Sequence, residues 1–311
     1  MPAPKLLLVL SENWTMTSPR DLRSLVRIAV EAEQAGVDGV MLSEHVVLGG
    51  SAGSEGVMAN PRDYALPGNQ EPDMPWPSSL VLLSAIAAVT ERLRLVAGAI
   101  IAPLRHPLLL ARELGTLDLL AEGRLVVIPT VSWHQDEYEA LGVPFPQRGA
   151  ILDEQLEVLG KAWGPGPFSH EGQFFRFDDV WLEPHPYREE GPVLWFGGQR
   201  MHGALLRRLV RYGSGFNPLG RPSDDDLALI RQGMLDAGRD PGELELVGGI
   251  RGRFPDAVGP ADLDEALESV PSQVARGFTT LCFKPSMYID GVGDVGVLCR
   301  SIATKLEALG C

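Results

Sequence analysis

Short hydrophobic runs alternate along the chain with longer stretches in which hydrophobic residues recur every three or four positions. The short runs are typical of buried parallel strands, and the longer stretches are typical of helices that cover a sheet. Eight runs predict strands, at residues 6–10, 40–43, 93–101, 125–128, 193–196, 215–217, 244–249 and 279–283. A helix is predicted after each strand, at residues 18–36, 79–90, 107–121, 150–163, directly after 197–198, and at 224–237, 262–276 and 295–309.

This alternation predicts the fold class. Eight strand–helix pairs match a (β/α)8 barrel, whereas a doubly wound sheet usually has about five or six strands and a G-x-G-x-x-G fingerprint after the first. No such fingerprint follows Leu10. The sequence therefore predicts one α/β domain, a TIM barrel over residues 1–311, with its chemistry at the carboxyl ends of the strands.

Two segments depart from the alternation. Residues 48–77 are rich in glycine and proline, show no periodicity and are long for a connection, which predicts a lid loop after the second strand. Residues 173–184 alternate aromatic and charged side chains, which predicts a small β insertion ahead of the fifth strand.

The charge and cysteine content narrow the classes of partner and compartment. The 311 residues include 41 acidic and 27 basic side chains, for a formal net charge of −14. A surface this acidic repels phosphate backbones and anionic lipids, so we expect a small-molecule substrate and neither nucleic acid nor membrane as a partner. Three cysteines without C-x-x-C spacing, and a first hydrophobic run too short for a signal peptide, favour the cytoplasm.

Candidate chemistry follows the second and third strands. Glu44 and His45 end the second strand, where they could serve acid–base catalysis or could only satisfy loop amides. Gly98 lies inside the third strand, which indicates either a bulge that a ligand approaches or close packing against a neighbouring strand. The residues alone leave both choices open.

The fifth predicted strand ends in Gly197 and Gly198, and a helix is expected almost at once. Small residues at a helix N-terminus let backbone amides face a phosphate, with Arg200 nearby. Gly198 and Gly203 have the spacing of P-loop glycines, but Ala204 stands where that motif needs lysine. A nucleoside triphosphate site is therefore excluded.

Acidic residues also follow the fourth strand, beside Trp133. His134, Asp136 and Glu137 could suggest a metal cluster or, with Glu44, a carboxylate pair for hydrolysis. The six histidines are scattered and form no H-E-x-x-H pair, so no metal is predicted. Cys282 at the end of the last strand is expected to be a small buried hydrophobic residue.

The run at residues 75–125, with SEHV at 43–46 before it, closely resembles the bacterial-luciferase-like family of flavin- and deazaflavin-dependent oxidoreductases. The branch it is most similar to uses coenzyme F420. The segments EYEALGVPFPQRG, FSHEGQFFRFDDVWLEPHP and VLWFGG continue the match in order, so that it covers most of residues 5–217.

The resemblance implies a TIM barrel that holds a flavin or deazaflavin in its mouth. By position, Glu44 and His45 would lie against the ring, and His45 would assist proton transfer. The other implied cofactor-binding residues are Gly98 and Ala99, which form a bulge often containing a non-proline cis peptide, Trp133 beside them, and Gly197, Gly198 and Gln199 at the phosphate. Candidates to contact the substrate are Trp14, Tyr64 and Trp76.

One departure from the family pattern bears on function. Related sequences have a glycine-alternating motif after the fourth strand, where this chain has Ile128 to Ser132, which would narrow the pocket wall. The first hypothesis is hydride transfer between reduced F420 and a small organic substrate, and an FMN-dependent monooxygenase is its alternative. The narrowed wall also allows a non-catalytic ligand-binding barrel, and the acidic residues allow a hydrolase that uses Glu44 with Asp136 or Glu137.

The second and third helices predict a homodimer. Residues 79–90 are apolar on every side of the helix, and residues 107–121 add a row of leucines. A monomer would expose these residues as a large hydrophobic patch, so we expect a second copy to cover them.

Overall fold

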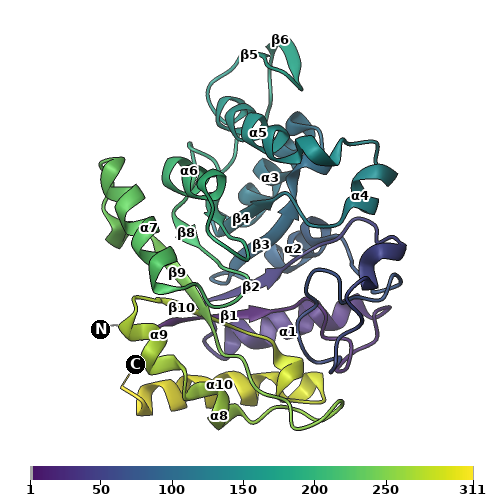
Figure 1. Ribbon diagram of the computed structural model, residues 1–311, viewed down its shortest axis with the longest axis vertical. Coiled ribbons are helices and arrows are strands. Elements are labelled where there is room, and N and C mark those ends of the chain that lie inside the picture. The colour runs from purple at the N-terminus through teal and green to yellow at the C-terminus, as the bar shows by residue number, and fades with distance from the viewer. Residues whose placement is uncertain (1–2, 311) are drawn as a thin grey trace.

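The computed structural model describes residues 3–310, which form a closed parallel barrel (Figure 1). The order around the barrel is β1 (Lys5–Val9), β10 (Thr280–Phe283), β9 (Glu245–Gly249), β8 (Gly215–Phe216), β7 (Val193–Phe196), β4 (Leu125–Thr130), β3 (Arg94–Ile101) and β2 (Gly39–Leu42). Each predicted strand is present, with ends that differ by no more than two residues. The predicted TIM barrel is confirmed.

Alternating side chains on each strand build two cores. On β1, Leu6 and Leu8 belong to the large core between the barrel and its helices. Leu7, between them, belongs to a smaller cluster to which most of the strands contribute inward-facing residues, namely Leu7, Val96, Val126, Ile128, Trp195 and Val247. The barrel interior is therefore filled with side chains, and a ligand has room only at its ends.

The helices cover the barrel in chain order (Figure 1). They are α1 (Leu22–Gln34), α2 (Ser79–Ala87), α3 (Pro107–Leu120), α5 (Arg148–Ala162), α6 (Gly203–Tyr212), α7 (Asp224–Asp236), α8 (Leu263–Leu267), α9 (Val270–Ala275) and α10 (Val295–Ala308). The first helix begins at Leu22 rather than at Ser18, because the side chain of Asp21 caps it by accepting from the Ser24 amide at 3.3 Å. The predicted helix at 262–276 is two helices, α8 and α9.

Three elements correct the sequence-based boundaries. A short helix that the pattern did not predict, α4 (Gln135–Ala140), follows β4. The β insertion is a hairpin of β5 (Phe168–Glu171) and β6 (Arg176–Val180), so it begins five residues before the predicted segment at 173–184. The helix expected directly after Gly198 begins at Gly203, and a loop separates the two.

The predicted lid at residues 48–77 crosses the carboxyl end of the barrel and has firm anchors there. Its regular structure is a single 3-10 turn, Gly50–Gly53. The Arg62 guanidinium donates to the carbonyls of Val258, Ser286 and Ile289 at 2.8, 3.0 and 3.1 Å. These bonds tie the middle of the segment to the loops that follow β9 and β10.

Two further findings concern the expectations about a membrane and about the cysteines. Across residues 3–310, the helices are all too short or too polar to cross a lipid bilayer. Cys282 and Cys299 are free thiols, and Cys282 is partly buried against the inner barrel cluster, close to the prediction for it. Cys311 lies outside the described residues.

Candidate active site

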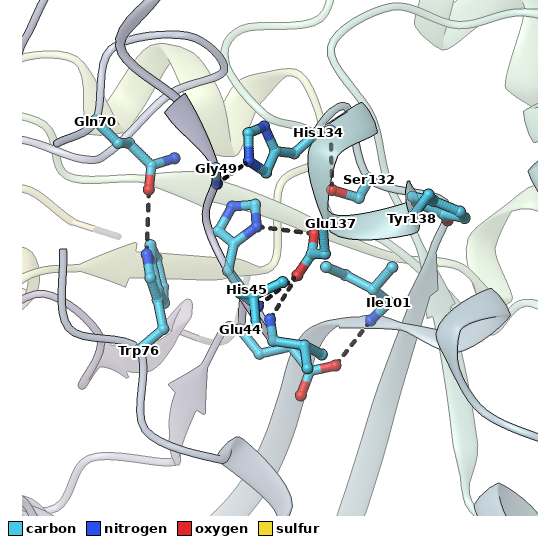
Figure 2. A network of polar contacts seen from close by, with 12 residues as sticks. Glu44, His45, Gly49, Gln70, Trp76, Ile101, Ser132, His134, Glu137 and Tyr138 are labelled. Atoms are coloured by element: carbon cyan, nitrogen blue, oxygen red, sulfur yellow. Dashed lines mark hydrogen bonds and ion pairs between the residues drawn. The ribbon is translucent and has the colours of Figure 1, made fainter. Parts of the chain in front are cut away.

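His45 and Glu137 form the centre of a buried polar network at the carboxyl end of the barrel (Figure 2). His45 Nδ1 lies 3.2 Å from Glu137 Oε2, and the other carboxylate oxygen accepts the Val46 amide at 2.5 Å. The side chain of Glu137 is fully buried. A carboxylate at Nδ1 favours the tautomer with the proton on that atom, so Nε2 is the nitrogen left to exchange a proton with a ligand.

Aromatic rings surround the His45 imidazole. Trp76 from the lid and Trp133 from the end of β4 meet it edge to face, with ring centroids 5.2 and 5.7 Å away. Trp76 is held by a 3.1 Å hydrogen bond from its indole nitrogen to Gln70 Oε1. Of the residues predicted to bind cofactor or substrate, the fold thus brings His45, Trp76 and Trp133 together.

Glu44 lies beside His45 in sequence, but its carboxylate points away from the imidazole (Figure 2). It accepts two hydrogen bonds from Arg105, at 2.7 and 2.9 Å, and one from the Ile101 amide at 2.9 Å. Ser79 Oγ donates a further one at 3.2 Å. Glu44 therefore joins the starts of α2 and α3 to the end of β3, and the carboxylate that contacts His45 is that of Glu137.

The sequence did carry a signal for the role of Glu137. Trp133 and Glu137 both follow β4 closely, at the end of the barrel where the carboxyl ends of the strands meet and where His45 follows β2. Both do reach His45. Sequence reasoning considered Glu137 only for hydrolysis or a metal cluster, because α4 was not predicted and the residue appeared to lie in an open loop.

Two more side chains from the start of α4 hold the beginning of the lid. His134 Nε2 accepts the Gly49 amide at 2.8 Å, and Asp136 Oδ2 accepts the amide and hydroxyl of Ser51 at 3.0 and 2.9 Å. Since Asp136 and Glu44 both have protein partners, the described residues contain no free carboxylate pair here of the kind that hydrolysis needs. Nor do residues 3–310 contain a group of three or more side chains suited to a metal.

The His134 contact makes the stability of the protein depend on pH. Burial lowers the pKa of His134 from its ordinary value of 6.5, an effect that Asp136 opposes and His45 reinforces. The unfolded chain therefore binds more protons at this site, so its contribution to stability is complete above pH 6.5 and is lost as the pH falls through the folded-state pKa. We expect wild type to lose more thermal stability than His134→Gln between pH 7.5 and 5. Parallel losses would contradict this assignment.

The bulge that the resemblance implies is present in β3. The Gly98–Ala99 peptide bond is cis, and the pairing of β3 with β4 shifts between Gly98 and Ile100. A Cβ atom on Gly98 would lie 2.8 Å from Ile128 Cδ1. Packing against β4 is thus sufficient to require glycine at position 98, whether or not a ligand also approaches it.

The altered end of β4 includes one residue in a conformation that glycine favours and one bulky side chain inside the barrel. Ser132 has φ +56°, the left-handed conformation that glycine adopts most easily. Ile128 is buried in the inner barrel cluster against the Gly98 bulge. Ile128 therefore fills space inside the barrel beside the bulge, and the narrowing of the pocket wall stays a prediction.

Gly197, Gly198 and Gln199 lie in the loop after β7. A Cβ atom on Gly197 would lie 1.8 Å from the Asn217 carbonyl oxygen, so the adjacent strand end requires glycine there. Gln199 is exposed. Because α6 begins only at Gly203, the backbone amides of Gly197 and Gly198 are part of the loop and not of a helix N-terminus.

A second polar cluster at the same end of the barrel was not identified from the sequence. It comprises Glu12 after β1, Arg251 after β9 and Lys284 directly after β10, and Lys284 is fully buried. The signal was their position at strand ends, which is where a TIM barrel carries its chemistry. Tyr64 of the lid lies among them, and its hydroxyl is one of several buried atoms at this end, within residues 3–310, that lack a hydrogen-bond partner: Trp14 Nε1, Thr15 Oγ1, Tyr64 OH and His134 Nδ1.

Comparisons with known proteins bear on the family and the fold of the chain. The family described as luciferase-like monooxygenase matches residues 6–251. An uncharacterized protein of Mycobacterium tuberculosis is 38% identical over 169 residues, which are 53% of this chain and 57% of that protein. The chain therefore spans little more than half the length of that relative.

A named relative and a solved structure extend the comparison. The FMNH2-dependent dimethylsulfone monooxygenase of Pseudomonas putida is 32% identical over 123 residues, covering 39% of this chain and 34% of that protein. The crystal structure of monooxygenase RslO1 from Streptomyces bottropensis superposes with a TM-score of 0.74 at 19% identity, over 99% of this chain and 100% of that one. The structural likeness bears on the fold alone.

Proposed function

The chain belongs to the luciferase-like monooxygenase family, as the sequence predicts, and on this premise we propose that it transfers hydride between reduced coenzyme F420 and a small organic substrate. The observation that carries the proposal is the His45–Glu137 pair, set between Trp76 and Trp133 at the mouth of the barrel. This pair can move a proton at His45 Nε2 while the surrounding rings exclude water.

The residues at the mouth fit a flavin-type ring. When bound, such a cofactor supplies a ring that carries hydride, and the ring has an edge of alternating N–H and C=O groups. Within residues 3–310, the buried His134 Nδ1 has no hydrogen-bond partner, and it is a polar atom that such an edge could satisfy. In this proposal the Gly98–Ala99 bulge and Trp133 hold the ring, and the loop from Gly197 to Gln199 takes the phosphate.

An FMN-dependent monooxygenase is the second candidate. The F420 proposal rests on the similarity of most of residues 5–217 to that branch of the family. The FMN alternative is supported by the relative from Pseudomonas putida, whose name states its dependence on FMNH2.

Titration of the purified protein with F420, and separately with FMN, tests the proposal through the fluorescence and absorbance of the cofactor. We expect F420 to bind wild type and to bind Trp133→Leu more weakly, because that ring lies at the mouth. Trp181→Leu is the control, since Trp181 is 65% exposed beside the hairpin. Binding of FMN alone would favour the second candidate.

The predicted narrowing of the pocket wall at Ile128 calls for one more variant in this titration. Ile128→Gly would restore the space that the side chain fills against Gly98. If neither cofactor binds wild type but one binds Ile128→Gly, the cofactor site has been closed in this chain. If neither cofactor binds either protein, the chain is a barrel without a flavin-type cofactor and the proposed function is wrong.

We also propose that the protein forms a homodimer through α2 and α3. The exposed face is narrower than the sequence suggested, because Leu82 is only 6% exposed and packs within its own chain. Val81, Val89 and Leu109 remain at least half exposed, at 71, 53 and 50%. These side chains support a hydrophobic interface between two copies.

Sedimentation and light scattering test the dimer. Wild type is expected to have the mass of two chains, and Leu109→Glu to have the mass of one at micromolar concentration, because a buried unpaired charge is costly. Leu229→Glu is the control, since Leu229 is equally exposed on α7. A monomeric wild type would refute the interface.

A further inference from the structure

The β1, β10 and β9 sector of the barrel mouth holds polar chemistry that the proposed cofactor site does not use. In that proposal the cofactor lies against the ends of β2, β3, β4 and β7, which are consecutive around the barrel. The ends of β9, β10 and β1 form the opposite sector. They carry Arg251, Lys284 and Glu12, and lid residues 63–65 lie on top of them.

Three contacts fix the lid onto this sector. Lys284 Nζ donates to the main-chain carbonyl of Asp63 at 2.5 Å, and Arg251 Nη2 lies 3.0 Å from Asp63 Oδ1. Glu12 Oε1 accepts the amide of Ala65 at 2.7 Å. Tyr64 is between the two anchored residues, so its position is set from both sides.

The hydroxyl of Tyr64 is buried, and its contact within residues 3–310 is with the thiol of Cys282, a weak hydrogen-bond acceptor. Within residues 3–310 it has no partner at normal hydrogen-bond geometry, whereas two other buried tyrosines are satisfied: the Tyr138 hydroxyl donates to the Val131 carbonyl at 2.5 Å and that of Tyr288 to the Ile250 carbonyl at 3.0 Å. Burial raises the pKa of Tyr64 well above its ordinary range, so the hydroxyl stays protonated and remains a donor. A buried donor that has only a thiol to accept from it is poorly satisfied, which indicates a ligand atom as its proper partner.

The charges around Tyr64 indicate what kind of atom that is. Lys284 Nζ and Arg251 Cζ lie 5.6 and 5.5 Å from the centre of its ring. These two cations are matched by Glu12 and Asp63. Burial raises the pKa of Glu12 and lowers that of Lys284. Whether the proton is on the carboxyl of Glu12 or on the amine of Lys284, the net charge of the two side chains together is zero. Both cations are thus already paired with carboxylates and do not favour an anionic ligand. A neutral oxygen atom of a ligand needs only a hydrogen-bond donor, which the Tyr64 hydroxyl supplies.

We propose that the Tyr64 hydroxyl is the hydrogen-bond donor for a neutral carbonyl oxygen of the substrate, bound in the β1–β10–β9 sector opposite the cofactor. The substrate class is thus a ketone, an aldehyde or an enone and not a carboxylate. The assignment of this sector to the substrate rests on the proposed function, because the cofactor proposed there takes the other half of the mouth.

The first test needs no ligand. Tyr64→Phe removes a hydroxyl whose contact within residues 3–310 is the weakly accepting thiol of Cys282, so the melting temperature should stay the same or rise. Tyr288→Phe is the matched control and should melt lower, because it removes the hydrogen bond to Ile250. If Tyr64→Phe is destabilised as much as Tyr288→Phe, the hydroxyl has a structural role and the proposal fails.

The second test uses three probes that share a phenyl ring: acetophenone, ethylbenzene and benzoate. Calorimetric or ligand-observed NMR titration of wild type should favour acetophenone over ethylbenzene by about tenfold, the value of one hydrogen bond, and Tyr64→Phe should lose this preference. Tyr288→Phe should keep it. Tighter binding of benzoate than of acetophenone, equal binding of the two neutral probes to wild type, or no binding of any probe at millimolar concentration would each overturn the proposal.

The same proteins separate this inference from the proposed function. If F420 and FMN both fail to bind while the acetophenone preference depends on Tyr64, the oxidoreductase proposal fails and the carbonyl subsite stands. If a cofactor binds but the preference is absent from wild type, the subsite fails and the oxidoreductase proposal stands.

Discussion

Replacing Arg105 with alanine is expected to lower the free energy of unfolding by about 3 to 5 kcal/mol, the usual cost of removing one partner from a buried ion pair. The side chain of Glu44 is 2% exposed, and Arg105 supplies its two charged hydrogen bonds. Without the guanidinium, the carboxylate keeps only the Ile101 amide and the Ser79 hydroxyl, which cannot neutralise its charge. Urea unfolding at pH 7.5 measures the effect.

Three variants make this measurement specific. Arg112→Ala, an exposed arginine on the neighbouring helix, should change stability by less than about 0.5 kcal/mol. Glu44→Gln in the Arg105→Ala background should recover part of the loss, because it removes the unpaired charge. Arg105→Ala with stability near that of wild type would show that Glu44 does not depend on this pair and would reopen a direct role for Glu44 at the ligand.

The barrel could be predicted from the sequence because its signal is local. Most of the strands are short hydrophobic runs bounded by turn residues, and helical segments separate them along the chain. The errors fall where a single side chain decides a boundary. Asp21 caps α1 three residues after the predicted start, and Glu154 fixes the turn of the β5–β6 hairpin by accepting the amides of Gln173, Phe174 and Phe175.

The candidate site was predicted only in part, because strand order places residues at an end of the barrel without giving their side-chain directions. His45, Trp76 and Trp133 do meet. The two glutamates, however, have the opposite roles to those that distance in the sequence suggests. Glu44, next to His45 in the chain, turns toward Arg105. Glu137, 92 positions from His45, turns toward the imidazole.

The pattern of hydrophobic and polar residues also could not predict contacts between residues far apart in the sequence. Arg62 looks like a solvated arginine in a glycine- and proline-rich loop, yet its guanidinium meets carbonyl groups that come more than 190 residues later. Lys284 looks like the polar residue after a strand, yet it is fully buried. A charged residue reads as exposed in a sequence, and its burial becomes evident only when its partners are known.

His45→Ala is expected to lower kcat by about 10²-fold or more while leaving the dissociation constant of the cofactor within about threefold of wild type. The reason is that hydride addition to a substrate must be balanced by a proton, and His45 Nε2 is the exchangeable position beside the aromatic walls of Trp76 and Trp133. With reduced F420 as the hydride donor and cyclohex-2-enone as the acceptor, turnover is followed by the absorbance of the cofactor as it is oxidised, and binding by a separate titration.

Glu137→Gln tests whether the pair acts as a unit. Glutamine retains an oxygen that can accept the Val46 amide, so the loop after β2 should stay folded, but the charge that orients and stabilises the imidazole is lost. We expect kcat to fall with little change in cofactor binding, and the double variant to be scarcely slower than His45→Ala, because the carboxylate acts through the histidine. If His45→Ala instead weakens cofactor binding and turnover by the same factor, the imidazole holds the ring and donates no proton. If His45→Ala turns over at the wild-type rate, the proton comes from another group at the mouth, and Tyr64 on the opposite side is then the next residue to replace.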